Sequence, residues 1–535
     1  MNDPRDTLQP RPSPSAFRQL LQRRVLARVL FAFVCLATLA GLFLTVQNLR
    51  SARAQEKAAG GILAENAEVA AIIPPSIPDE ENFAAIPFFE TLFGTNSSHK
   101  PDPRQWPEHY DQAARIAGDY ETDANRNNPD RKMTDFAAWQ FAFQTIGDDE
   151  TNPANNASEP DRTVDRGTAA AAILQALKVY DPVLDELRAA SHRPGSRFNV
   201  RYDLENPWGI LLPHLRVIRG TWWVLKLRAV AELAAGQTAP AFEDVKLMLR
   251  LVESIQGEPM LVSQLVRVAG LNLSTEPIWE GLAERQWPEA ALQELQTRLG
   301  QFDLLADLKQ AFRAERAWGN LTISLVRNKR KGDMFLSLVS TGQPPEPWKT
   351  EANSRFKTCP LAWFDEERRN YNRWFEMLYP PEFDAQARRV FPRKAEENEK
   401  AMEQALANNS TLLTNHLVMA KEFLIPPAKP LTKFANAQCV VDQAVLACAL
   451  ERFRLASGQY PETLAALAPR FIDKLPRDVI SGELPKYRRA EDGRFVLYSV
   501  GWNETDDGGV IAVTKDRVPR QKATEGDWVW QYPAR

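Results

Sequence analysis

The sequence predicts a mainly α-helical protein in three parts. These are an N-terminal transmembrane helix, an irregular stack of α-helical hairpins, and a small C-terminal α+β module with one helix on a three-stranded antiparallel meander. Three observations lead to this prediction. An uncharged apolar run lies near the start, apolar residues recur at three- and four-residue steps through the middle, and short alternating segments close the chain. Because 535 residues exceed one ordinary core, we expect several folded units.

Composition and charge indicate a globular chain that does not bind nucleic acid. Charged residues make up 25% of the sequence and hydrophobic residues 44%, which is typical of globular proteins. The formal net charge is −3, whereas nucleic-acid binders are usually basic or carry a basic stripe. The basic cluster at 328–331 is short and is better interpreted as a solvated helix end.

The apolar run at 29–49 is uncharged over its whole length, and about 20 apolar residues are needed to span a bilayer as a helix. The tail at 1–28 holds six arginines and only two acids. By the positive-inside rule, this tail is cytoplasmic and everything after Arg50 is extracytoplasmic. We therefore expect a single-pass protein of the bacterial inner membrane. Two alternatives stay open, since Ala52-Arg53-Ala54 fits a signal-peptide cleavage site and Arg23-Arg24 fits a twin-arginine signal.

The region at 50–165 is rich in Pro, Asn and Asp and is expected to be extended and irregular, with one helix at 133–145. The segment at 166–430 forms the α-helical body. Its apolar spacing predicts helices that begin near Leu215, Phe242, Leu261, Leu292 and Leu304, and a further helix at 360–379. A 34-residue repeat is absent, so the hairpins do not form a tetratricopeptide array.

The proline-rich joint at 425–430 separates the body from the C-terminal module at 431–520, and 521–535 is expected to be a tail. A helix ends at Gly458, a short helix follows at 462–467, and strands on either side of Glu491-Asp492-Gly493 predict a hairpin. A third strand is expected at 510–514, which completes the meander.

The same region resembles the globular domain of the type II secretion major pseudopilin. The matching features are an Arg-Leu helix end before Gly458-Gln459-Tyr460-Pro461, a Leu-Pro-x-Asp step at 475–478, and Tyr-Ser-Val-Gly at 498–501 before a Gly-Gly loop. The resemblance implies a calcium ion held in that loop by Asn503, Asp506 and Asp507, since calcium prefers clustered oxygen ligands. The alternative is a hairpin turn with solvated acids. The chain also departs from the family, because it lacks the glutamate of a prepilin-peptidase site in its apolar run.

No residue of the sequence is predicted to be catalytic or to bind a cofactor. The five histidines lack metal-ligand spacing, and the P-loop and nucleophile-elbow motifs are absent. His214 is expected to be a structural histidine. None of the four cysteines forms a C-x-x-C pair. Cys359 either pairs with Cys439 or Cys448 outside the cytoplasm, or all three are separate buried thiols.

The leading hypothesis for function is a membrane-anchored, extracytoplasmic scaffold or protein-binding component of the cell envelope, without catalytic activity. The alternatives are an envelope hydrolase with a dispersed active site, because missing motifs are weak negatives, and a component associated with a secretion apparatus. A deep pocket with convergent Asp, Glu or His side chains would favour the hydrolase.

Overall fold

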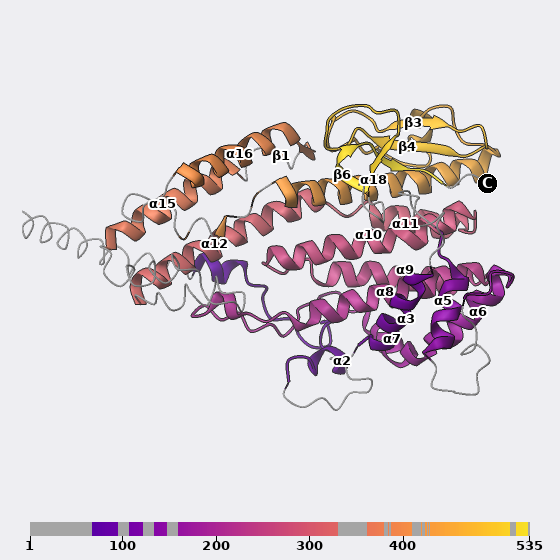
Figure 1. Cartoon of the computed structure of the whole chain (residues 1–535), viewed down its shortest axis with the longest axis horizontal. Coiled ribbons are helices and arrows are strands. Elements are labelled where there is room, and N and C mark those ends of the chain that lie inside the picture. The colour runs from indigo at the N-terminus through magenta and orange to yellow at the C-terminus, as the bar shows by residue number, and fades with distance from the viewer. Residues whose placement is uncertain are drawn as a thin grey trace, which may run out of the picture. The chain divides into compact units, whose positions relative to one another are not determined.

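Helices make up most of the chain in the computed structural model (Figure 1). This structure describes residues 67–94, 106–120, 133–146, 159–329, 361–378, 383–384, 387–408, 419, 423–424, 426, 428–513 and 521–532. The chain divides into two compact units, which are Met1–Ala64 with Ile323–Arg368, and Glu65–Thr322 with Arg369–Arg535. In the first unit, the Arg327 guanidinium lies 3.1 Å from a carboxylate oxygen of Asp365. The mainly helical fold and the small antiparallel C-terminal sheet module are confirmed.

The predicted anchor at 29–49 lies outside the described residues, as does the basic tail at 1–28. A search of the described helices finds none with the length and apolarity to span a bilayer. The anchor therefore stays a prediction from the sequence.

The first helices of the second unit are short. They are α2 (Pro87–Glu90), α3 (Glu108–Asp119), α5 (Phe136–Thr145), α6 (Arg166–Leu177) and α7 (Asp181–Ala190), with the 3-10 turns η2 (Lys178–Tyr180) and η3 (Pro207–Gly209). Helix α5 confirms the helix expected at 133–145, and its N-cap Asp135 accepts a hydrogen bond from the Ala138 N–H. Helix α3 is an addition, because its region was expected to be irregular. It forms on a narrow stripe of Tyr110, Ala113 and Ala117, all buried.

The body continues as longer antiparallel helices that follow the predicted apolar spacing. They are α8 (Pro213–Ala234), α9 (Thr238–Ser254), α10 (Leu261–Ala283), α11 (Glu289–Leu299) and α12 (Leu304–Lys329). Helix α8 packs against α6, α9 and α10. It ends at Ala234, and Gly236 follows with a φ of 74°, the left-handed conformation that glycine adopts freely. Trp222 of α8 is fully buried and donates to the Met248 carbonyl of α9.

A second group of elements leads into the C-terminal module. It consists of α15 (Leu361–Leu378), the hairpin β1 (Phe383–Asp384) and β2 (Arg389–Val390), and α16 (Pro392–Asn408). Helix α15 confirms the helix expected at 360–379. The Val390 N–H donates to the Val479 carbonyl at 2.8 Å, which ties the hairpin to the module.

Helix α18 (Ala428–Ser457) is the centre of the C-terminal part. It contacts α10 and α11 of the body, and it also contacts strands of the module, so it lies between the two (Figure 1). Nearly every residue between Ala444 and Glu451 is buried as a result. Its end at Gly458, with a φ of 83°, confirms the predicted stop. Cys439 and Cys448 are both buried on this helix, whereas Cys359 lies outside the described residues, so its pairing stays a prediction.

The sheet confirms the predicted hairpin and corrects the predicted meander. After the 3-10 turn η4 (Leu464–Leu467) come β3 (Lys486–Arg489), β4 (Phe495–Ser499), β5 (Ile511–Val513), β6 (Gln521–Gly526) and β7 (Trp528–Trp530). Strands β3 and β4 pair antiparallel, but the other neighbour of β4 is β7, while β5 pairs with β6.

The segment expected to be a tail therefore supplies the third strand. Trp528 and Trp530 alternate with Val529, and both tryptophans are buried. Burying two indole rings stabilises this pairing far more than the smaller side chains of β5 would.

Candidate functional site

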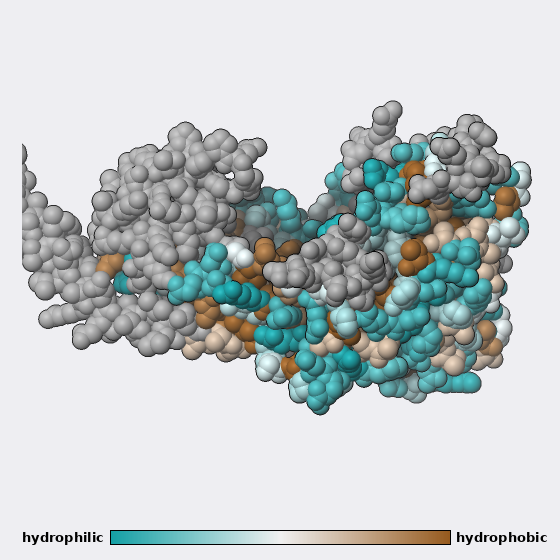
Figure 2. All heavy atoms as spheres, turned by 90° about the horizontal axis from the view of Figure 1, so that it is seen from below, coloured by the Kyte–Doolittle hydropathy of each residue, from teal (hydrophilic) through white to brown (hydrophobic). Residues whose placement is uncertain are grey.

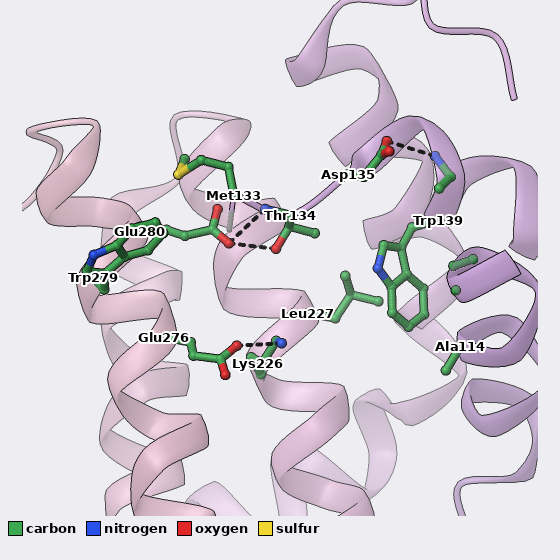
Figure 3. A pocket seen from close by; sticks show the side chains of 13 residues that line it. Ala114, Met133, Thr134, Asp135, Trp139, Lys226, Leu227, Glu276, Trp279 and Glu280 are labelled. Carbon is green, nitrogen blue, oxygen red and sulfur yellow. Dashed lines mark hydrogen bonds and ion pairs between the residues drawn. The ribbon is translucent and has the colours of Figure 1, made fainter. Parts of the chain in front are cut away.

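A cavity of about 410 Å³ opens among α3, α5, α8 and α10, and we call it the cleft (Figure 3). All four helices belong to the second unit. The walls combine apolar side chains with charged ones, and this mixture and volume are typical of ligand pockets. The lining side chains labelled in Figure 3 are Ala114, Met133, Thr134, Asp135, Trp139, Lys226, Leu227, Glu276, Trp279 and Glu280.

Glu280 of α10 is the buried acid of the cleft, with 5% of its surface exposed. One carboxylate oxygen accepts from the Thr134 N–H at 3.0 Å and from its hydroxyl at 2.6 Å. The other oxygen accepts from Arg166 at 2.9 Å. Burial raises the pKa of Glu280, while the Thr134 hydroxyl and Arg166 oppose that rise. The carboxylate thereby fixes the segment before α5 against α10.

Glu276 lies one turn earlier on α10 and forms an ion pair of 2.6 Å with Lys226 of α8. The side chain of Glu276 is 41% exposed, whereas that of Lys226 is 19% exposed. The Lys226 ammonium also lies 5.0 Å from the centre of the Trp223 ring. The pair therefore has its acidic end open to solvent.

Asp135 and Trp139 bring α5 into the cleft. Beyond its cap on Ala138, Asp135 forms an ion pair of 2.7 Å with Arg162. The Trp139 ring lies 5.2 Å from the Tyr110 ring of α3, which holds α3 and α5 together. On the opposite wall, Trp279 donates to the Gln531 carbonyl beyond β7, so the C-terminal module buttresses the cleft.

Each of Asp135, Glu276 and Glu280 is already paired with a donor of the protein. The lining residues include no Ser, Cys or His side chain, and the hydroxyl of Thr134 donates to Glu280. A Ser, Cys or His nucleophile is thus not among the lining residues that the structure describes.

The residues predicted to hold calcium lie together in the turn after β4. The Asn503 amide donates to Asp507 at 2.9 Å. The Asp506 carboxylate lies 3.2 Å from the Lys486 ammonium and accepts from the Tyr498 hydroxyl at 3.1 Å. These contacts occupy oxygens that calcium would need, and the described residues contain no group of three or more His, Cys, Asp or Glu side chains suited to a metal. The calcium site stays a prediction.

A third acid that contacts this turn is Asp527. It is fully buried and accepts the N–H groups of Asp507 and Gly509. It stabilises the loop through the backbone.

His214 is buried, as expected of a structural histidine. Its Nε2 lies 2.6 Å from a Glu258 carboxylate oxygen, and its ring stacks on Phe198 at 4.3 Å.

Sequence reasoning missed the cleft, although a signal for it exists. Glu276 and Glu280 are spaced four apart on the largely buried helix α10, and Lys226 lies on the largely buried helix α8. Charged residues inside a buried helix need partners, so their positions mark a polar contact between helices. The identity of the partner Thr134 could not be read from spacing, because it lies far away in the sequence. Comparisons with protein-family models, with curated proteins and with solved structures find no match for this chain.

Proposed function

We propose that this protein is a membrane-anchored, extracytoplasmic binding protein without catalytic activity, and that its cleft holds a segment of a partner protein. The observation that carries this proposal is the pairing of all three lining carboxylates with donors of the chain itself. A site built this way is rigid before the partner arrives, which lowers the entropy cost of binding.

The chemistry of the walls suggests the kind of segment. Met133, Trp139 and Leu227 offer apolar surface beside the open carboxylate of Glu276. A segment with an apolar side chain followed by a lysine or arginine would bury the first and pair the second with Glu276. Hydrophilic residues cover most of the coloured surface on the face in Figure 2, as expected of a body in water.

Gly118 allows the cleft to be blocked without disturbing the core. It lies at the end of α3 and lines the cleft, and an added Cβ would meet no atom within 4 Å. Gly118→Phe should therefore fill the opening and abolish capture of the partner from crosslinked membranes. Gln112→Phe, on an exposed part of the same helix, is the matched control and should capture as the native chain does. Equal capture by both variants would refute the cleft as the binding site.

The anchoring part of the proposal rests on the uncharged run at 29–49 and the arginines before it. A periplasm-active reporter fused after Arg535 should be active, whereas a cytosol-active one should be silent. The reverse pattern would remove the extracytoplasmic assignment and leave the binding role to be judged separately.

One observation favours a hydrolase as a second candidate. Asp135, Glu276 and Glu280 converge on one cavity, and burial raises the pKa of Glu280 toward the range of a general acid. If this were an active site, Glu280→Gln would abolish hydrolysis of envelope glycans or peptides. We expect the native chain to hydrolyse neither glycans nor peptides, so that Glu280→Gln has no activity to abolish.

A further inference from the structure

A second cavity, of about 520 Å³, lies between α11, α18, the turn before β2 and the segment at 472–477. We call it the Asp442 cavity. Its charged lining residues are Arg388, Asp442, Asp473, Lys474 and Arg477. It shares no lining residue with the cleft, and it plays no part in the function proposed above.

Asp442 is the buried charge of this cavity, with 8% of its surface exposed. Its Oδ1 accepts from Arg388 at 3.2 Å and from Gln438 at 3.1 Å. Its Oδ2 is buried and has no hydrogen-bond partner among the residues that the structure describes. Most buried polar atoms in folded proteins are paired, so a carboxylate oxygen without a donor indicates a site that a ligand or a bound water completes.

Arg388 is held at the wall in an unusual backbone conformation. Its φ is 49°, in the left-handed region that residues other than glycine rarely adopt. Neighbouring β2 is fixed to the module through the Val390 N–H, so the turn has little freedom to relax. The Arg388 side chain is 34% exposed, and its guanidinium forms an ion pair with Asp442. Such backbone outliers cluster at binding sites, where the surrounding structure maintains them.

The other two cations of the cavity are Lys474 and Arg477. Within the part of the chain that the structure describes, neither Lys474 nor Arg477 pairs with an acid, and Arg477 donates only to the Gly482 carbonyl. The positive side chains thus outnumber the acids Asp442 and Asp473. Between them lies an apolar wall of Val445, Ile472, Leu475 and Pro476.

We propose that the Asp442 cavity binds a small organic anion, a phosphate monoester or carboxylate attached to an apolar group, with the anionic head between Arg388, Lys474 and Arg477. The apolar group packs on Val445 and Leu475. Arginine and lysine together favour such heads through charge-assisted hydrogen bonds.

Asp442 need not repel the anion. Burial raises the pKa of its carboxyl to about 6, with repulsion from Asp303 adding to the rise and Arg388 and Gln438 opposing it. Below about pH 6 the carboxyl is therefore mostly protonated and can donate to the bound head.

Calorimetric titration of the full chain in detergent micelles tests this proposal. Phenyl phosphate should bind with a Kd of about 1 mM or tighter, and phenol and inorganic phosphate should bind at least about tenfold more weakly. Lys474→Ala and Arg477→Ala should each weaken phenyl phosphate binding about tenfold. Arg470→Ala removes an exposed cation from the same segment that does not line the cavity, and should leave binding unchanged. All three residues are exposed, so the variants should fold alike.

Several results would overturn the proposal. These are no heat with phenyl phosphate up to about 10 mM, equal weakening by Arg470→Ala, or equal affinity for phenol. Dihexanoyl phosphatidate binding more tightly than phenyl phosphate would support the same chemistry and identify a lipid headgroup as its source. Gly118→Phe should not change any of these titrations, which separates this site from the cleft.

Discussion

The cleft and the Asp442 cavity both bury a carboxylate, but the two carboxylates differ in how many of their oxygens accept hydrogen bonds. In the cleft, both oxygens of Glu280 accept from Thr134 or Arg166. Among the described residues, one carboxylate oxygen of the Asp442 cavity has no donor, and Lys474 and Arg477 have no acidic partner. A fully paired buried charge fixes the fold around it, whereas unpaired charges leave the capacity to bind a charged ligand. The cleft therefore offers shape and apolar surface, and the cavity offers charge.

The largest expected effect is the loss of unfolding free energy when the buried acid of the cleft is removed. Glu280→Ala leaves the Thr134 N–H and hydroxyl without their acceptor, which should lower the free energy of unfolding by about 3 kcal/mol. Glu276→Ala, one turn away with a half-exposed ion pair, should cost at most about 1 kcal/mol. Urea unfolding measures both. Equal losses would mean that the cleft is no more organised around Glu280 than around its exposed neighbour.

The next largest effect is a pH dependence of stability that arises from Asp442. Because burial raises the pKa of Asp442 to about 6 from its ordinary value of 3.8, the folded chain binds that proton more tightly than the unfolded chain. The contribution to stability is complete below about pH 4 and is lost as the pH rises to about 6, up to about 3 kcal/mol. Unfolding free energies of the native chain and Asp442→Asn should therefore diverge between these pH values, with the native chain losing stability. Parallel curves would mean that burial does not raise the pKa of Asp442.

A smaller effect concerns the loop of Asn503, Asp506 and Asp507, whose acids are partly paired. If the resemblance to pseudopilins extends to calcium, millimolar calcium should raise the free energy of unfolding by about 1 kcal/mol relative to a chelator. Magnesium and the variant Asp507→Asn serve as controls. Identical unfolding in calcium and chelator would leave the loop as a hairpin turn with solvated acids.

The smallest change in stability is expected for the two substitutions that should weaken ligand binding most. Lys474→Ala and Arg477→Ala remove exposed side chains without acidic partners in the described chain, so each should change the unfolding free energy by about 0.5 kcal/mol or less. A loss of 2 kcal/mol or more, about four times that amount, would indicate that these cations support the fold.

The spacing of apolar residues was sufficient to predict the helices of the body, because this spacing depends on the helix itself and not on its partners. Trp222, Leu225 and Ala229 lie on one face of α8 because the helix repeat puts them there, whatever they contact. Gly236 and Gly458 mark helix ends by their own conformational freedom.

Strand pairing was not predictable in the same way. The sequence favoured a meander with 510–514 as the third strand, but Trp528 and Trp530 pair with β4 instead. The choice depends on which side chains fill the space over α18, and that space exists only after the body and the module have come together.

The same limit explains why both sites escaped prediction. Glu280 meets Thr134 across 146 residues of sequence, and Asp442 meets Arg388 across 54. No motif spacing encodes contacts of this range, so the sequence alone suggested no binding residue outside the 503–507 loop.

Photo-crosslinking within the cleft tests the central claim most directly. A diazirine amino acid of methionine's size in place of Met133 would lie in the wall of the cleft without filling it, and the same group in place of the exposed Gln112 of α3 would lie in solvent. We predict one reproducible protein adduct from position 133, absent from position 112, in which the crosslinked peptide carries an apolar residue beside a lysine or arginine. No adduct at 133, or the same adducts at both positions, would contradict a partner segment in the cleft.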